Sequence, residues 1–175
     1  MTIARKLALL VLFALLGMGV MTAWFLVSER KLILEERQTG VRQVVEVAHG
    51  IAVHFHTLST KGAMPDEEAR QRAAAAMQAL RYSGNEYIWI NDMHPRMVMH
   101  PVRPELNGQD LSANKDPNGL PLFMEFVRIV KTQGAGFVPY MWPKAGSDIP
   151  VEKTSYVKGF EPWGWVIGSG VYIDT

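Results

Sequence analysis

The N-terminal stretch Leu7–Val27 places the strongest constraint on this chain, because it carries no charged side chain and is nearly all Leu, Val, Ala, Phe and Met. A helix of this length spans about 31 Å, close to the hydrocarbon thickness of a bilayer. Arg5 and Lys6 precede it, and basic residues beside a span favour the cytoplasmic side. We therefore predict a cytoplasmic N-terminus at residues 1–6, a transmembrane helix at residues 7–27, and an extracytoplasmic body at residues 28–175.

A cleaved signal peptide is the competing interpretation of this stretch. Its apolar run is longer than the usual core of a signal peptide, and it continues through Trp24 and Val27 without a small-x-small cleavage site. Both observations favour an uncleaved anchor. Because no second apolar run of spanning length follows in the sequence, we expect a single N-terminal span and one exported body.

The composition of the 175 residues is typical of a globular body and excludes several classes of function. Hydrophobic residues make up 48% and charged residues 20%, which is enough apolar side chain to bury a core. The formal net charge of +1 gives no basic surface for nucleic acid. The absence of cysteine excludes disulfides, thiolate metal sites and cysteine nucleophiles.

Residues 28–61 are predicted to form one long helix that continues out of the membrane. Its first part is highly charged, and its second part carries a wide apolar stripe with heptad-like spacing. The stripe consists of Val41, Val44, Val45, Val47, Ala48, Ile51, Ala52, Phe55 and Leu58. A stripe this wide serves two surfaces, a sheet and a partner helix, so we predict a parallel homodimer through residues 7–58. A helix that packs only on its own domain is the alternative.

Three histidines on this helix do not predict a metal site. His49 and His54 are separated as i, i+5, and His54 and His56 as i, i+2. Neither separation gives the i, i+4 pair that binds zinc on one face of a helix. We therefore expect surface or capping histidines, and we predict neither a metal nor a cofactor.

Two further helices are predicted along the chain. The first spans residues 66–82, where Pro65 precedes an acidic start and Arg81 lies at the end, as the helix dipole prefers. The second spans residues 120–133 and follows residues 102–119, a long loop rich in Asn, Asp, Gly and Pro. Loops of this length are usually functional or packed on themselves. The buried face of the second helix is predicted to carry Phe123, Phe126, Val127 and Val130.

The hairpin at residues 87–100 is where a ligand cavity is expected. Residues 87–91 are aromatic and β-branched, and Pro95 lies in the turn before the returning strand. Period-2 alternation divides the first strand into two faces, with Tyr87, Trp89 and Asn91 on one and Ile88 and Ile90 on the other. An aromatic and polar face opposite an apolar face indicates a strand between a cavity and a core. An ordinary core hairpin is the alternative.

Three more strands complete the predicted sheet, at residues 136–142, about 152–159 and 165–172. Turn residues rich in Pro and Gly connect them. The sequence therefore predicts an α+β fold, in which an N-terminal transmembrane helix continues into a long helix and then into a five-stranded antiparallel sheet flanked by helices. The helices are expected to gather on one side of the sheet.

Beyond these patterns, the sequence contains a series of specific blocks: YIWINDMHPRMVMHP, LNGQDLS, DPNG, GFVPYMWPK and KTSYVKGFEPWGWVIGSGVYID. In this order they resemble the single Cache sensor domain of bacterial methyl-accepting chemotaxis proteins, over residues 35–174. The resemblance implies a PAS-like domain in the periplasm, anchored in the inner membrane, with a long helix at about 28–61 and a sheet domain at about 62–175. Members of that family bind small molecules, often short carboxylates, and pass a signal inward.

The resemblance does not decide which class of signalling protein the sensor domain belongs to. The chain is predicted to be the extracytoplasmic sensor domain of a membrane chemoreceptor that binds a small organic molecule, most simply a short-chain carboxylate. The sensor portion of a histidine kinase or other transducer is one alternative, and a standalone anchored Cache protein that binds a protein partner is another. An enzyme is not expected, because a GxSxG elbow, a zinc signature and a P-loop are all missing from the sequence.

The predicted binding site centres on Lys153, because a carboxylate in a mostly apolar cavity requires a cation or several donors. Tryptophans wall the carbon chain, and tyrosines and a histidine add donors. The full set is Tyr87, Trp89, His100, Tyr140, Trp142, Lys153 and Tyr156. Lys153 and Tyr156 lie on opposite faces of an ideal strand, so a bulge is required if both contribute. If only one contributes, Lys153 is favoured.

Overall fold

The computed structural model describes residues 2–173, except for the side chains of residues 8, 9, 11, 14, 30 and 31. Residues 174 and 175, the end of the predicted sheet domain, lie outside this range. The chain divides into two units, residues 1–37 and residues 38–175. The whole sheet and every residue of the predicted binding set belong to the second unit.

Three α-helices form at the segments where the sequence predicts them. α1 spans Ile3–Thr60, so the predicted membrane segment and the predicted long helix form one helix. α2 spans Asp66–Ala79 and ends before residue 82, the predicted end, because Leu80 is already extended. α3 spans Leu122–Gln133 and has a strongly one-sided burial pattern, with its apolar residues facing the protein interior.

The predicted transmembrane segment, residues 7–27, lies within α1. The side chains of residues 8, 9, 11 and 14, which belong to that segment, lie outside the described part of the chain. For the residues that the structure describes, no helix combines the length and the apolarity that crossing a membrane requires.

The five strands form one antiparallel sheet in the order β2-β1-β5-β4-β3, which confirms the predicted sheet. Their bounds are Ile88–Asp92 for β1, Met97–Met99 for β2, Ala135–Pro143 for β3, Pro150–Phe160 for β4 and Trp165–Tyr172 for β5. Two short 3-10 helices lie in the connections, η1 at Pro104–Leu106 and η2 at Glu161–Trp163. β1 pairs with the C-terminal strand β5, so the hairpin and the three later strands share one sheet.

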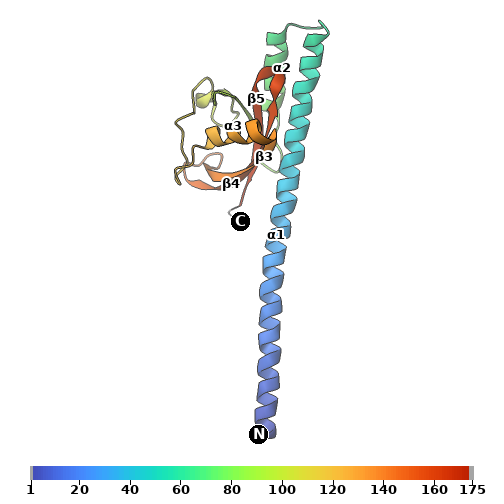
Figure 1. Ribbon diagram of the computed structural model, residues 1–175, viewed down its shortest axis with the longest axis vertical. Helices are drawn as coiled ribbons and strands as arrows, with labels where there is room; N and C mark the ends of the chain where they lie inside the picture. Colours follow the sequence, from blue (N-terminus) through green and yellow to red (C-terminus); the bar gives the residue numbers. More distant parts are fainter. Residues whose placement is uncertain (1, 174–175) are drawn as a thin grey trace. The chain divides into compact units, whose positions relative to one another are not determined.

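Helices cover both faces of the sheet, which corrects the expectation that they gather on one side (Figure 1). α1 and α2 pack on one face and α3 packs on the other. The reason is visible in β1, where Ile88 and Ile90 face one side and Trp89 faces the other. Because both faces of this strand are hydrophobic, each one requires a covering layer.

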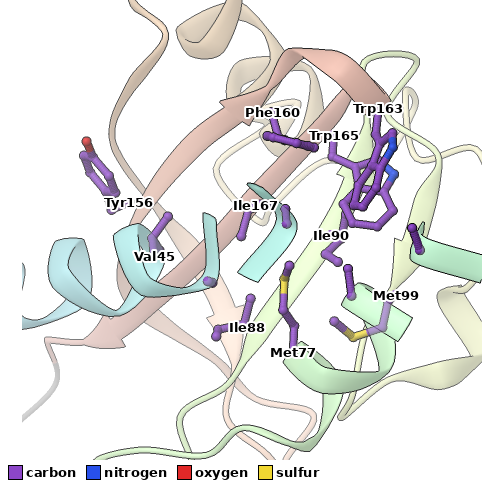
Figure 2. Packing of buried hydrophobic residues seen from close by; sticks show 14 of the residues in the cluster. Val45, Met77, Ile88, Ile90, Met99, Tyr156, Phe160, Trp163, Trp165 and Ile167 are labelled. Atoms are coloured by element: carbon purple, nitrogen blue, oxygen red, sulfur yellow. The ribbon is translucent and has the colours of Figure 1, made fainter. Parts of the chain in front are cut away.

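The first core lies between the sheet and helices α1 and α2, and Figure 2 shows its packing. Its members include Val45, Met77, Ile88, Ile90, Met99, Tyr156, Phe160, Trp163, Trp165 and Ile167. The predicted stripe of α1 divides here, because Val45 and Ala52 are fully buried whereas Val47 is 65% exposed. The second core lies under α3 and contains Trp89, Phe123, Phe126, Val138, Tyr140, Trp142, Val157 and Val166.

Candidate ligand-binding site

A cavity lies in the second core, between α3 and the sheet. Its free volume is about 10 Å³, room for about one water molecule, so a ligand of several atoms needs the lining side chains to move. Its lining residues are Tyr87, Trp89, His100, Leu122, Phe123, Phe126, Tyr140 and Trp142. The lining is mostly aromatic, with two tyrosines and one histidine as polar members, so the cavity suits a small ligand with an apolar part and a polar group.

The first strand of the hairpin supplies one wall of this cavity. Trp89 projects from the α3-facing side of β1, as the alternation predicted, while Ile88 and Ile90 face the first core. The indole Nε1 of Trp89 donates a hydrogen bond to Oδ1 of Asn91 at 3.2 Å, and its ring lies 5.5 Å from the ring of Phe126. Because its N–H is already bonded, Trp89 offers the cavity an aromatic surface and no free donor.

The long loop at residues 102–119 is tied to the sheet by Asp116, a buried carboxylate. Its Oδ1 accepts hydrogen bonds from the backbone N–H groups of Asn118 and Leu120, both at 2.9 Å. Its Oδ2 accepts a hydrogen bond from the backbone N–H of Met141 at 3.0 Å. Because Met141 lies between two cavity-lining residues of β3, Asp116 fixes the start of α3 against two walls of the cavity.

Lys153 is buried, with only 1% of its surface exposed; it does not line the cavity, but its ammonium group contacts the lining residue Tyr87. Its Nζ donates long hydrogen bonds to the hydroxyl groups of Tyr87 at 3.4 Å and of Tyr172 at 3.3 Å. The same atom lies 4.5 Å and 4.4 Å from the centroids of these two rings. Burial lowers the pKa of Lys153 to about 8, so the group is a cation at neutral pH but a poorly solvated one.

The carboxylate that faces Lys153 is Glu86, in the turn between α2 and β1. Its Oε2 lies 3.9 Å from Nζ of Lys153. This oxygen is buried and has no hydrogen-bond partner among the described residues. Burial raises the pKa of Glu86, and attraction to Lys153 and Lys144 opposes that rise. The ion pair is long, and the other contacts of the ammonium group are the long hydrogen bonds to Tyr87 and Tyr172.

His100 contributes a neutral imidazole to the cavity. Its Nδ1 accepts hydrogen bonds from the backbone N–H groups of Arg103 at 2.9 Å and of Val102 at 3.3 Å. In the neutral ring the proton must then sit on Nε2. Burial, with repulsion from Lys153 and Arg103, lowers the pKa of His100 to about 3. His100 is therefore a hydrogen-bond donor through Nε2–H and not a second cation.

The structure brings the predicted binding residues together, with one exception. Tyr87, Trp89, His100, Tyr140 and Trp142 line the cavity, and Lys153 contacts the lining residue Tyr87 without lining the cavity itself. Tyr156 instead lies in the first core, with its ring centroid 4.9 Å from that of Phe137 (Figure 2). The pairing of β4 with β5 runs without a register shift from Lys153 to Phe160. Because no bulge intervenes, the sheet itself separates Tyr156 from the cavity.

Several residues that line the cavity or contact Lys153 were not in the predicted set: Glu86, Leu122, Phe123, Phe126 and Tyr172. Phe123 and Phe126 belong to the buried face of α3 that the sequence predicts, so that face already contained the signal, whereas Leu122 was not assigned to it. Tyr172 stands opposite Lys153 in the β4–β5 pair. That neighbour follows only from the strand register, which the sequence leaves undetermined.

The histidines of α1 have packing contacts. His49 and His56 approach Phe160 edge-on, at ring-centroid distances of 5.4 Å and 5.8 Å, and His54 packs against Phe55. Across the described residues, no group of three or more His, Asp or Glu side chains is arranged to hold a metal ion.

The chain belongs to the Cache domain family, whose model matches residues 21–175. It is similar to the methyl-accepting chemotaxis protein McpP of Pseudomonas putida, with 42% identity over 174 residues. This match covers 99% of the chain but 32% of McpP, so the chain spans about a third of the length of this curated relative. The predicted resemblance to Cache domains of chemotaxis proteins is confirmed.

Two solved structures share this fold with substantial sequence identity. One is a periplasmic sensor domain of a chemotaxis protein, 55% identical, with a TM-score of 0.80 over 81% of this chain and 98% of that one. The other is a Cache chemosensory domain whose structure explains carboxylic acid recognition. It is 48% identical, with a TM-score of 0.79 over 82% of this chain and 98% of that one.

Proposed function

We propose that this chain is the extracytoplasmic sensor domain of a membrane chemoreceptor and that it binds a short-chain carboxylate in the cavity under α3. The observation that carries the proposal is the buried ammonium group of Lys153, which contacts Tyr87, one of the residues that line an aromatic cavity. The neighbour that recognises carboxylic acids supports the ligand class. The proposed ligand-binding residues are Tyr87, Trp89, His100, Tyr140, Trp142 and Lys153.

The electrostatics of the site favour an anionic ligand. An ammonium group has three donors, and those of Lys153 meet tyrosine hydroxyls at 3.3 Å and 3.4 Å and a carboxylate at 3.9 Å. Charge-assisted hydrogen bonds are typically about 2.7–2.9 Å long and stronger than neutral ones. A carboxylate that reached Lys153 would thus replace weak contacts by a strong one. The Nε2–H group of His100 offers it a second, neutral donor.

The size of the cavity limits the ligand and its affinity. The free volume of about 10 Å³ holds about one water molecule, so a carboxylate of a few carbons would enter as the aromatic walls formed by Trp89 and Phe126 shift. An acid of about four to six heavy atoms gains at most roughly 6–9 kcal/mol, at up to about 1.5 kcal/mol per atom. Dissociation constants of about one micromolar or weaker are therefore expected.

A thermal-shift series tests the proposed function. Short monocarboxylates such as acetate, propionate and butyrate should raise the unfolding midpoint of the chain by several degrees when present at about 100 times their dissociation constant, which corresponds to roughly 2.7 kcal/mol. The amide and the alcohol of the same carbon skeleton are the matched controls, because they fill the same space without the negative charge. Equal stabilisation by acid and amide, or stabilisation by none of the acids, would contradict the proposal.

The proposal includes a membrane anchor and a periplasmic location for the sensor domain. Residues 7–27 of α1 would anchor the chain in the inner membrane, with residues 28–175 in the periplasm. The support is the uncharged sequence after Arg5 and Lys6, together with the periplasmic location of the sensor domain that is 55% identical. α1 also contributes Val45 and Ala52 to the first core, so the same helix joins the sheet domain to the proposed anchor.

A parallel homodimer through α1 is the proposed assembly. The support is the division of the α1 stripe, since Val47 is 65% exposed while Val45 is buried. The natural chain lacks cysteine, so single cysteines along residues 41–55 report one contact at a time. We expect disulfide cross-links between chains at positions such as Val47, and none at the buried control position Val45. A uniform lack of inter-chain products along α1 would rule the dimer out.

A further inference from the structure

Glu86 occupies the place beside Lys153 for which an incoming carboxylate would compete. Its Oε2 lies 3.9 Å from Nζ of Lys153, too far for a hydrogen bond, and it has no other hydrogen-bond partner among the described residues. Backbone hydrogen bonds of 3.1 Å and 3.2 Å between Glu86 and Tyr82 fix the turn that carries this side chain. The domain thus holds a carboxylate of its own next to the cation of the site, in a weak pairing.

We propose that Glu86 is an internal counter-ion of Lys153, that a bound carboxylate displaces it, and that Glu86 takes up a proton as the ligand binds. This inference rests on the proposed function, because it requires a carboxylate at Lys153. Two carboxylates that share one ammonium group away from water repel each other, and this repulsion disappears when one of them is protonated. Glu86 takes the proton because it is the member without a hydrogen bond.

The other groups that face Glu86 keep their charge state between about pH 5 and 7. Four tyrosines interact electrostatically with Glu86, namely Tyr82, Tyr87, Tyr140 and Tyr172; burial raises the pKa of each, so they remain neutral. Lys153 on β4 and Lys144 in the β3–β4 turn are the cations that attract it. His100, whose pKa is about 3, stays neutral as well. A proton gained in this pH range therefore reports on Glu86 or on the ligand.

The sign of the pH dependence follows from this exchange. The ligand acid is ionised in solution at about pH 6, because unperturbed carboxyl groups have pKa values near 4. If binding adds a proton to Glu86, the affinity rises as the pH falls from about 7 to about 6. At these pH values Lys153, with a pKa of about 8, is protonated both before and after binding.

Calorimetry of the full chain with propionate, in two buffers of different ionisation enthalpy at about pH 6, measures both the affinity and the protons taken up. The parent chain should take up a fraction of a proton per ligand. Glu86→Gln should bind propionate roughly tenfold more tightly or better, because the competing charge is gone, and it should take up no proton. Glu152→Gln is the matched control, since Glu152 is an exposed neighbour of Lys153 and loses the same charge.

Two results would overturn the inference while leaving the proposed function intact. One is a Glu86→Gln chain that binds propionate no more tightly than the parent. The other is a proton uptake that persists in Glu86→Gln, because it would place the proton on the ligand. A parent chain that binds no carboxylate at all contradicts the proposed function itself, so the two failures are distinguishable.

Discussion

Lys153→Met is expected to weaken carboxylate binding by roughly 30-fold to several thousand-fold, the equivalent of about 2–5 kcal/mol for the loss of one partner of a buried charge pair. The methionine keeps the length and the apolar stem of the lysine but leaves the ligand without its cation. Titration calorimetry of parent and variant with propionate measures the difference. Lys153→Ala should lose at least as much affinity, but it also opens a cavity in the core.

Lys153→Met leaves the carboxylate of Glu86 without its counter-ion, and removing one partner of a buried ion pair is usually destabilising, so this variant should unfold at a lower temperature than the parent. The double variant Glu86→Gln/Lys153→Met removes both charges and avoids that cost, so its fold should be about as stable as that of the parent. A normal unfolding midpoint with lost binding in the double variant therefore separates a role in recognition from a role in folding. Lys131→Ala, on the exposed side of α3, and Tyr156→Phe, on the other face of the sheet, should both bind like the parent. Parent-like binding by Lys153→Met would show that the proposed pocket is wrong.

The local part of this site follows from the sequence because strand alternation is a local property. The pattern from Tyr87 to Ile90 separates an aromatic face from an aliphatic one, and the two faces do enter different cores. Parity along β4 likewise sets Lys153 and Tyr156 on opposite sides. The same parity argument made Tyr156 the doubtful member of the predicted set, and its place in the first core agrees with that.

The parts that sequence analysis missed depend on contacts between distant segments. Asp116 lies in a stretch that is typical of a turn, but the backbone group of Met141 that it holds is 25 positions away. Glu86 lies at the end of a turn, and only the pairing of β1, β5 and β4 brings it to Lys153. The two-sided helix cover was also missed, although the hydrophobic residues on both faces of β1 already required it.

Gly168→Ala is expected to abolish ligand binding and to destabilise the fold by about 1–3 kcal/mol, the usual cost of overpacking a core. Gly168 lies on β5 beside the ring of Trp89, and a Cβ atom there would come within 2.7 Å of Cε2 and 2.8 Å of Cη2 of that ring. The β1–β5 pairing fixes both backbones, so the ring has to move. The space available to it is the cavity, because Trp89 is one of the cavity walls.

A displaced Trp89 ring would fill the volume that the ligand needs, so the variant should remain folded at low temperature yet fail to respond to propionate. Chemical denaturation measures the first effect and calorimetry the second. Gly50→Ala is the matched control: it adds the same methyl group at an exposed position of α1 with no atom within 4 Å, and it should stabilise the fold by about 0.5–1 kcal/mol without changing binding. If Gly168→Ala bound propionate as tightly as the parent, the ligand would have to lie away from Trp89, and the cavity under α3 would not be its site.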